Sequence, residues 1–112
     1  MAKMQKKNLN SPDQTMTFEK GKAEVVKVGN VTITRMTFEP GWRWSEHVKP
    51  IAKTGSCEKK HLIYCIEGRS RVRMNDGTEL EYGPGDVVSI PPGHDGWTVG
   101  DKTFIGIDIS QE

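Results

Sequence analysis

Short runs of apolar and alternating residues, separated by glycine and proline, follow one another along the chain. The most regular run is His61–Glu67, which is apolar on both of its faces, with Ile63 and Cys65 on one and Leu62, Tyr64 and Ile66 on the other. A strand of this kind needs cover on both sides. No run has the helical period, so the pattern predicts an all-β chain of about eight to ten short strands in a small sandwich or barrel. The other expected strands are 15–18, 23–28, 31–38, 69–75, 78–82, 87–90, 97–99 and 103–109.

The stretch Gly83–His94 combines strong turn signals with a short strand. A Gly-Pro-Gly turn leads into Val87–Ile90, and Pro91-Pro92-Gly93 ends this strand, because proline cannot donate a ladder hydrogen bond. His94 and Asp95 follow directly. Such a turn would hold a titratable side chain at the mouth of a β-structure. The alternative is a strand, a tight turn and a surface histidine.

The composition indicates one domain without a bulk charge. The chain has 112 residues, with 16 Lys and Arg against 15 Asp and Glu, so we expect neither nucleic acid nor a membrane as a partner. It has no apolar run of bilayer length and no signal-peptide region, which favours a cytoplasmic protein with Cys57 and Cys65 as reduced thiols. We expect residues 1–14, which are polar and aperiodic, to form a flexible arm, and residues 15–112 to form a single β-barrel domain.

Two of the three tryptophans lie in the segment Gly41–Pro50. They either cover the core or line a pocket, and for at least one of them we favour the core. The residues that follow, 51–60, are expected to form a loop or a lid. If the segment is extended, one face carries Arg43, Ser45, His47 and Lys49, and the other carries Trp42, Trp44 and Glu46.

The spacing of glycine, proline and histidine resembles the two sequence motifs of the cupin family. The resemblance covers residues 40–109 and implies an antiparallel jelly-roll barrel, that is, a small single-domain cupin. It also points to a metal site inside the barrel. The matched positions of the first motif are Gly41, His47, His61 and Gly68, and those of the second are Gly85, Pro91 and Gly93.

Several ligand positions of the family's usual metal site carry other residues in this chain. Lys49 stands in place of the second histidine of the first motif, His61 in place of its glutamate, and Gly96 in place of the second-motif histidine. His94 lies two residues before Gly96, on the same side of an extended segment. We therefore expect His47, His61 and His94 to bind one divalent ion, which would be zinc, iron, nickel, copper or manganese. Its affinity should fall below about pH 6.5, as the imidazoles become protonated.

Two features of the sequence oppose this metal site. Lys49 would place a cation beside the ion, and His61 could instead be a buried histidine that is hydrogen-bonded to Asp95 or Glu46. Cys57 is a weaker candidate for a fourth ligand, because it lies in the expected loop.

Two classes of function remain open at this stage. As a metal-dependent oxygenase or isomerase, the protein would act on a small polar molecule, with Asp95 or Glu46 as acid or base. As a non-catalytic cupin, it would bind a small ligand without metal. The residues expected to contact a ligand are Arg43, Trp44, Lys49 and Trp97.

The apolar outer face of His61–Glu67 also predicts the oligomeric state. A small barrel covers only the inner face of this strand, so Leu62, Tyr64 and Ile66 would be exposed on a monomer. A symmetric homodimer is the commonest way to cover such a face, and the N-terminal arm could cross to the partner.

Overall fold

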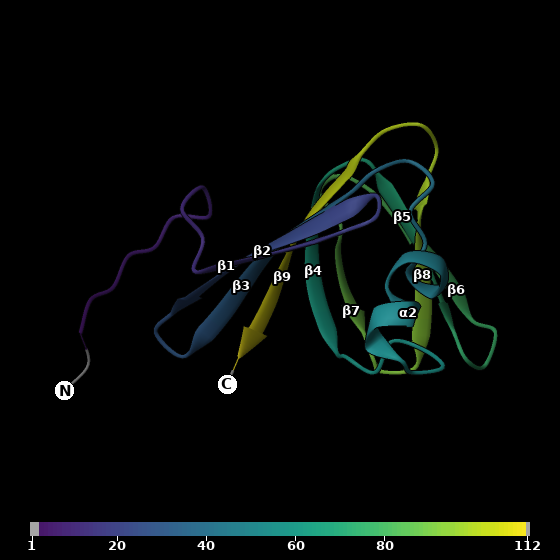
Figure 1. Cartoon of the computed structure of the whole chain (residues 1–112), viewed down its shortest axis with the longest axis horizontal. Coiled ribbons are helices and arrows are strands. Elements are labelled where there is room, and N and C mark those ends of the chain that lie inside the picture. Colours follow the sequence, from purple (N-terminus) through teal and green to yellow (C-terminus); the bar gives the residue numbers. More distant parts are fainter. Residues whose placement is uncertain (1–2, 112) are drawn as a thin grey trace.

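Two antiparallel β-sheets form the body of the protein, which is described by a computed structural model over residues 3–111. The sheets face each other on the right of Figure 1, and the first strands of the chain extend to the left. The expected all-β antiparallel jelly roll is thereby confirmed. The larger sheet has the order β1 (Gln14–Phe18), β2 (Gly21–Val28), β3 (Val31–Phe38), β9 (Phe104–Gln111), β4 (His61–Glu67) and β7 (Val87–Ile90). The smaller sheet has the order β6 (Glu79–Tyr82), β5 (Arg69–Met74) and β8 (His94–Val99).

The turn chemistry explains why these strands pair locally. Val28 lies opposite Val31, so β2 and β3 are joined by the two residues Gly29 and Asn30. Gly29 has a φ of 60°, which glycine adopts without steric cost. Between β5 and β6, the Asp76 carboxylate accepts the Thr78 N–H at 2.9 Å and fixes the hairpin.

The core lies between the two sheets and is centred on Phe104, which is completely buried. Its ring packs edge-on against Tyr82 at 5.7 Å and stacks with Phe38 at 5.8 Å. On β4, Ile63 and Cys65 point into this core, as the alternation predicted, whereas the side chains of the opposite face are exposed.

The end of β4 needs a glycine for steric reasons. The register with β9 shifts between Cys65 and Glu67, and Gly68 then turns the chain with a φ of 74°. A Cβ atom at Gly68 would collide with the Thr103 carbonyl oxygen, so the two backbones approach too closely for any other residue.

The segment 41–50 is not extended, so the division into two faces that an extended segment would give does not apply. Two short helices occupy this region, α1 (Trp44–His47) and α2 (Lys49–Ala52). The Ser45 N–H in the first turn of α1 is accepted by the Asp95 carboxylate at 3.0 Å, a contact across 50 residues that the local pattern cannot show. Within the described residues, no helix is long and apolar enough to span a membrane.

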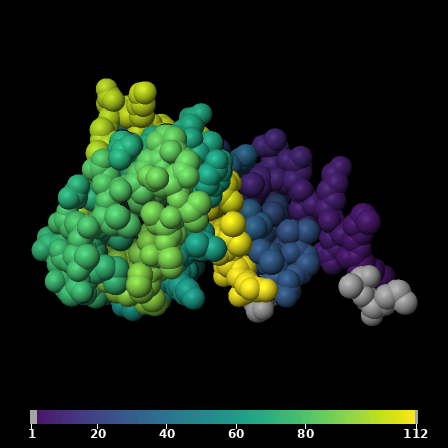
Figure 2. Space-filling view, turned by 180° about the vertical axis from the view of Figure 1, so that it is seen from behind, coloured from purple at the N-terminus to yellow at the C-terminus, as the bar shows by residue number. Residues whose placement is uncertain are grey.

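Residues 3–13 contain no helix or strand and lie along β2 and β3. Gln5 accepts the Gly29 N–H at 2.9 Å, and Arg35 donates to the Leu9 carbonyl at 3.4 Å and to Asn10 at 3.2 Å. Figure 2 shows this purple segment beside the blue strands, away from the green body of the barrel. The division into a flexible arm and a barrel domain remains a prediction.

Candidate metal centre

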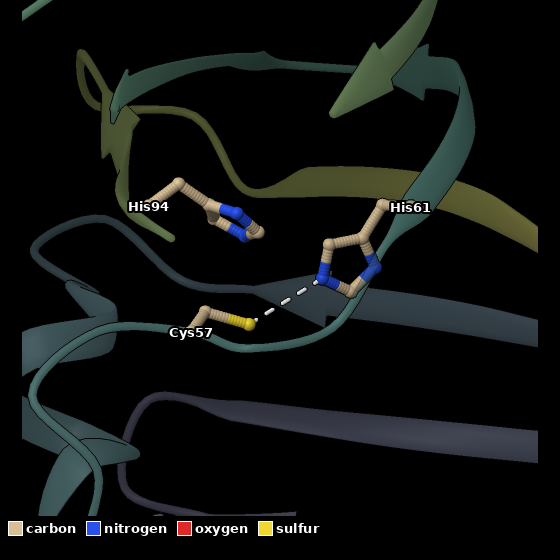
Figure 3. Close-up of side chains that lie close together, drawn as sticks. All are labelled: Cys57, His61 and His94. Carbon is tan, nitrogen blue, oxygen red and sulfur yellow. Dashed lines mark hydrogen bonds between the residues drawn. The ribbon is translucent and has the colours of Figure 1, made fainter. Parts of the chain in front are cut away.

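Three side chains with metal-binding atoms meet at one end of the barrel, namely Cys57, His61 and His94 (Figure 3). One ligand atom from each lies within 4.8 Å of the others. Cys57 and His94 are buried and His61 is half-buried. The group therefore sits below the surface, where a bound ion would be largely shielded from water.

Each of these residues is placed by a different part of the fold. His61 and His94 are the first residues of β4 and β8, and both follow the inward alternation of their strands. Cys57 comes from the loop before β4, and its backbone pairs with the start of β8. The Cys57 N–H donates to the His94 carbonyl at 2.7 Å, and the Gly93 N–H donates to the Cys57 carbonyl at 2.7 Å. The loop is thus held against the turn that precedes β8.

Hydrogen bonds orient both imidazoles. His61 Nδ1 lies 2.6 Å from Asp108 Oδ2, and its Nε2 lies 3.6 Å from Cys57 Sγ. His94 Nδ1 lies 2.8 Å from the Pro91 carbonyl oxygen, which can only accept, so Nδ1 carries a proton and donates it to this oxygen. The two rings are 5.2 Å apart and inclined at 68°. A partner that fixes the ring while the other nitrogen stays available is the usual arrangement of metal-binding histidines.

The electrostatics of the site favour a thiolate. Burial opposes ionisation of Cys57, but hydrogen bonds with His61 and His94 outweigh it and lower the pKa of the thiol from 9.0 to about 6. Burial also opposes the charge on His61, yet the hydrogen bonds to Asp108 and Cys57 raise the pKa of this imidazole from 6.5 to about 9. A thiolate and a protonated imidazole therefore face each other at neutral pH.

The structure brings His61 and His94 together but puts Cys57, and not His47, beside them. His47 ends α1, and its Nδ1 accepts the Arg43 N–H at 3.0 Å. It belongs to no group of three or more close metal-binding side chains in the described part of the chain. The cause is the helical turn, which replaces the extended strand that would have carried His47 inward.

The two expected acid–base residues lie apart from this cluster. Asp95 accepts the Arg43 Nε–H at 3.1 Å and the N–H groups of Ser45 and Gly96, so its carboxylate stabilises the local backbone. Glu46 is exposed on α1. Neither residue is hydrogen-bonded to His61, whose partner is Asp108.

The four expected ligand-binding residues divide among three places. The Arg43 guanidinium lies 4.4 Å from the centre of the Trp97 ring, which is half-buried on β8. Trp44 is buried in a second apolar cluster, together with Trp42 and Cys57. Lys49 is exposed at a shallow cleft. The core interpretation of the tryptophans in segment 41–50 is confirmed for both of them.

Cys57 was considered only a weak candidate ligand and Asp108 was not considered, although the sequence contains a signal for each of them. Cys57 precedes His61 by four positions, a short spacing that is common between metal ligands. Asp108 is a lone carboxylate in the apolar run Phe104–Ile109, and it pairs with Ile63 across the sheet. A charged group at an inward position of a strand usually has a partner, which here is His61.

The sequence profile of the EutQ-like cupin domain matches residues 47–104, which is more than half of the chain. The chain belongs to the EutQ-like cupin domain family. The matched region includes the three residues of the cluster and the strands that hold them, so this cupin domain carries the site within its family core.

Solved structures support the same fold for this cupin domain. Oxalate decarboxylase from Bacillus subtilis superimposes with a TM-score of 0.66 at 21% identity over 89% of this chain and 28% of that chain. A second structure of this enzyme, which concerns its Mn(II) centres, gives 0.62 at 22% identity over 84% and 26%. A protein from Neisseria meningitidis gives 0.58 at 10% identity over 80% and 82%. The cupin domain spans little more than a quarter of the decarboxylase, and no curated protein matches its sequence.

Proposed function

We propose that this cupin domain binds one divalent metal ion through Cys57 Sγ, His61 Nε2 and His94 Nε2. The observation that carries the proposal is the convergence of these three side chains within 4.8 Å. A thiolate and two neutral imidazoles are ordinary ligands of zinc, iron, nickel and copper, so the donor set fits such an ion. Asp108 would keep the proton on His61 Nδ1 and so leave Nε2 for the ion.

We further propose that the metal serves chemistry on a small polar molecule, in an oxygenase or isomerase reaction. Three protein ligands leave a position of a tetrahedral ion open for water or substrate. When bound, the ion supplies Lewis acidity at that position. The residues of the chain hold and orient the site, because Asp108 fixes the His61 ring and the Pro91 carbonyl fixes the His94 ring.

Metal content measured on protein purified without an affinity tag tests the proposal. We expect close to one ion per chain in the wild-type protein, and a loss of that ion in H61A, H94A and C57S. His47→Ala is the matched control, because it removes a histidine that lies outside the cluster and should keep the ion. A wild-type protein that takes up none of zinc, iron, nickel, copper or manganese would remove the basis of the proposal.

A second candidate function is the binding of a small anion without metal. It is favoured by a shallow cleft of about 440 Å³ beside α2, whose lining includes two lysines, Lys49 and Lys53. Calorimetric titration of chelator-treated protein with oxalate or inorganic phosphate tests it. The double variant K49Q/K53Q should no longer bind the anion. If the anion binds equally well to the variant and to the wild-type protein, the cleft is not the binding site.

We also propose a homodimer that works in the cytoplasm. Leu62, Tyr64 and Ile66 are 41%, 45% and 43% exposed on β4, and Val87 beside them is 63% exposed. The described hydrogen bonds of the arm go to β2 and β3, so they leave this face open. Both cysteines are free thiols, which a reducing compartment preserves.

Light scattering at high micromolar concentration tests the dimer. We expect twice the monomer mass for the wild-type protein and the monomer mass for Y64K, because a lysine in the centre of the apolar face would oppose its burial. Lys22→Glu, on β2, is a control for the effect of a charge change at another exposed site. A monomeric wild-type protein would contradict the proposal.

A further inference from the structure

The segment 53–60 is attached to the barrel at its centre. Ser56 and Cys57 are buried, whereas Lys53, Lys59 and Lys60 around them are exposed. The attachment consists of the backbone pairing between Cys57 and the Gly93–His94 region, a hydrogen bond from Asn75 Nδ2 to Ser56 Oγ at 3.2 Å, and the packing of Cys57 with Trp42 and Trp44. The exposed residues on either side of this anchor can open locally unless something else fastens them.

The metal-binding atoms connect this loop to two strands. Cys57 belongs to the loop, His61 begins β4 and His94 begins β8. Figure 3 shows the Cys57 sulfur and the two rings turned toward one another from these three segments. An ion bound by all three would therefore link the centre of the loop to both sheets.

The donor set of the cluster is soft. It contains one sulfur and two imidazole nitrogens, and no carboxylate belongs to the group. The nearby Asp108 carboxylate is already engaged, since Oδ2 bonds His61 Nδ1 at 2.6 Å and Oδ1 accepts the Leu62 N–H at 3.3 Å. Manganese, magnesium and calcium prefer oxygen ligands, whereas thiolate and imidazole ligands suit zinc and its chemical neighbours.

The charges of the site match a divalent ion. The Cys57 thiolate and the Asp108 carboxylate would supply two negative charges, and the two imidazoles would coordinate as neutral ligands once His61 has lost a proton. A buried ion with two positive charges would be balanced, which removes much of the cost of burying it. Lys49, which the sequence placed beside the ion, is exposed on α2.

We propose that the Cys57–His61–His94 site selects a thiophilic divalent ion of the zinc class over manganese, and that the bound ion fastens the 53–60 loop to the barrel. This inference rests on the proposed metal binding. It assigns to the ion a structural role at the loop in addition to any chemistry at its open position.

Competition between zinc and manganese tests the selectivity. Chelator-treated protein is incubated with both ions in equal excess, desalted and analysed for both elements. We expect about one zinc per chain and less than about a tenth as much manganese. Manganese uptake equal to that of zinc would overturn the selectivity and leave the proposed metal binding intact, whereas no uptake of either ion would overturn both.

Cobalt provides a second readout that reports on the sulfur ligand directly. A thiolate bound to Co(II) gives a charge-transfer absorption in the near ultraviolet, which we expect in the wild-type and H47A proteins. The band should be absent in C57S. Its presence in C57S, or its absence in wild-type protein that holds cobalt, would overturn the role of Cys57.

Limited digestion with trypsin tests the fastening of the loop. Cleavage after Lys53, Lys59 and Lys60 requires the loop to open, whereas Lys3 and Lys6 in the arm are internal controls that no metal should affect. With zinc at about 100 times its dissociation constant, the open population and the cleavage rate in the loop should fall about 100-fold. Cleavage in the arm should stay constant.

Two variants distinguish an effect of zinc on the 53–60 loop from an effect on the stability of the whole fold. C57S keeps the backbone pairing of the loop, and H94Q keeps a donor for the Pro91 carbonyl, so both should fold with the circular dichroism spectrum of the wild type. In both, zinc should no longer slow cleavage in the loop. Unchanged cleavage in zinc-loaded wild-type protein, or full protection of C57S by zinc, would overturn the inference.

Discussion

In the proposed metal site, a proton on His61 would compete with the ion for the Nε2 atom. The hydrogen bonds to Asp108 and Cys57 outweigh burial and raise the pKa of His61 to about 9, so at pH 7 roughly 99% of these imidazoles are protonated. Cys57, with a pKa of about 6, is already a thiolate in roughly nine-tenths of the molecules. Metal binding at pH 7 should therefore release close to one proton, and that proton comes from His61.

The size of the effect follows from the distance between the pKa and the working pH. Removing a proton from a group with a pKa of about 9 at pH 7 costs on the order of 3 kcal/mol, or a factor of about 100 in apparent affinity. Zinc affinity should thus increase about tenfold per pH unit between about pH 7 and pH 9 and then level off. With an ordinary histidine, zinc affinity would stop increasing above about pH 6.5, which is what the sequence alone predicted.

Calorimetry provides the direct measurement. Zinc is titrated at one pH in two buffers of different ionisation enthalpy, and the difference gives the number of protons released. A competing zinc chelator gives the affinity from about pH 6 to about pH 9.5. Affinity that is constant between pH 7 and pH 9, or binding without proton release, would refute this reasoning.

Asp108→Asn is the matched variant for this experiment. It keeps the size of the side chain but removes one of the two charges that stabilise protonated His61, while the Cys57 thiolate remains, so the rise in affinity should end at a clearly lower pH than in the wild type. At pH 9 the variant should also bind zinc about 10–100-fold more weakly, because the partner that orients the His61 ring is weakened.

Two further predictions concern the stability of the fold. Phe104→Ala removes the completely buried centre of the core and should lower the free energy of unfolding by about 3–5 kcal/mol in urea denaturation, whereas I51A, at an exposed position of α2, should change it by less than about 0.5 kcal/mol. Gly68→Ala should destabilise the protein by more than about 1 kcal/mol, because its φ is 74° and a Cβ would collide with Thr103. Gly77→Ala also has a positive φ but open space around it, so equal melting temperatures for the two alanine variants would contradict the steric argument.

The strands were predictable because their signals are local. Val31–Phe38, His61–Glu67 and Val87–Ile90 have the bounds that their alternation and flanking turns predicted. The conformation of segment 41–50 was not predictable from local signals. The first turn of α1 depends on a hydrogen bond to Asp95, which lies on a distant strand. Period-2 alternation in this segment was therefore accidental, and the burial of Trp42 and Trp44 against other parts of the core decided its conformation.

The candidate site was predictable where it depends on strand alternation. His61 and His94 lie on the inner faces of β4 and β8, as their positions relative to Ile63 and Gly96 indicated. The third member could not be found in this way, because Cys57 lies in an irregular loop and is placed by backbone pairing with His94. Long-range pairing of a loop leaves no periodic trace in the sequence.

The position of β9 between β3 and β4 determines when the site can exist during synthesis. Chains are made from the N-terminus, so β1–β3 and β4–β8 leave the ribosome before the strand that joins them in the larger sheet. Asp108, the partner of His61, lies on this last strand. A nascent chain can therefore display Cys57, His61 and His94 without the orienting carboxylate. Tight loading of a metal would have to wait until the ribosome has released the end of the barrel and β9 has inserted, a step that also closes the most distant pairings of the fold.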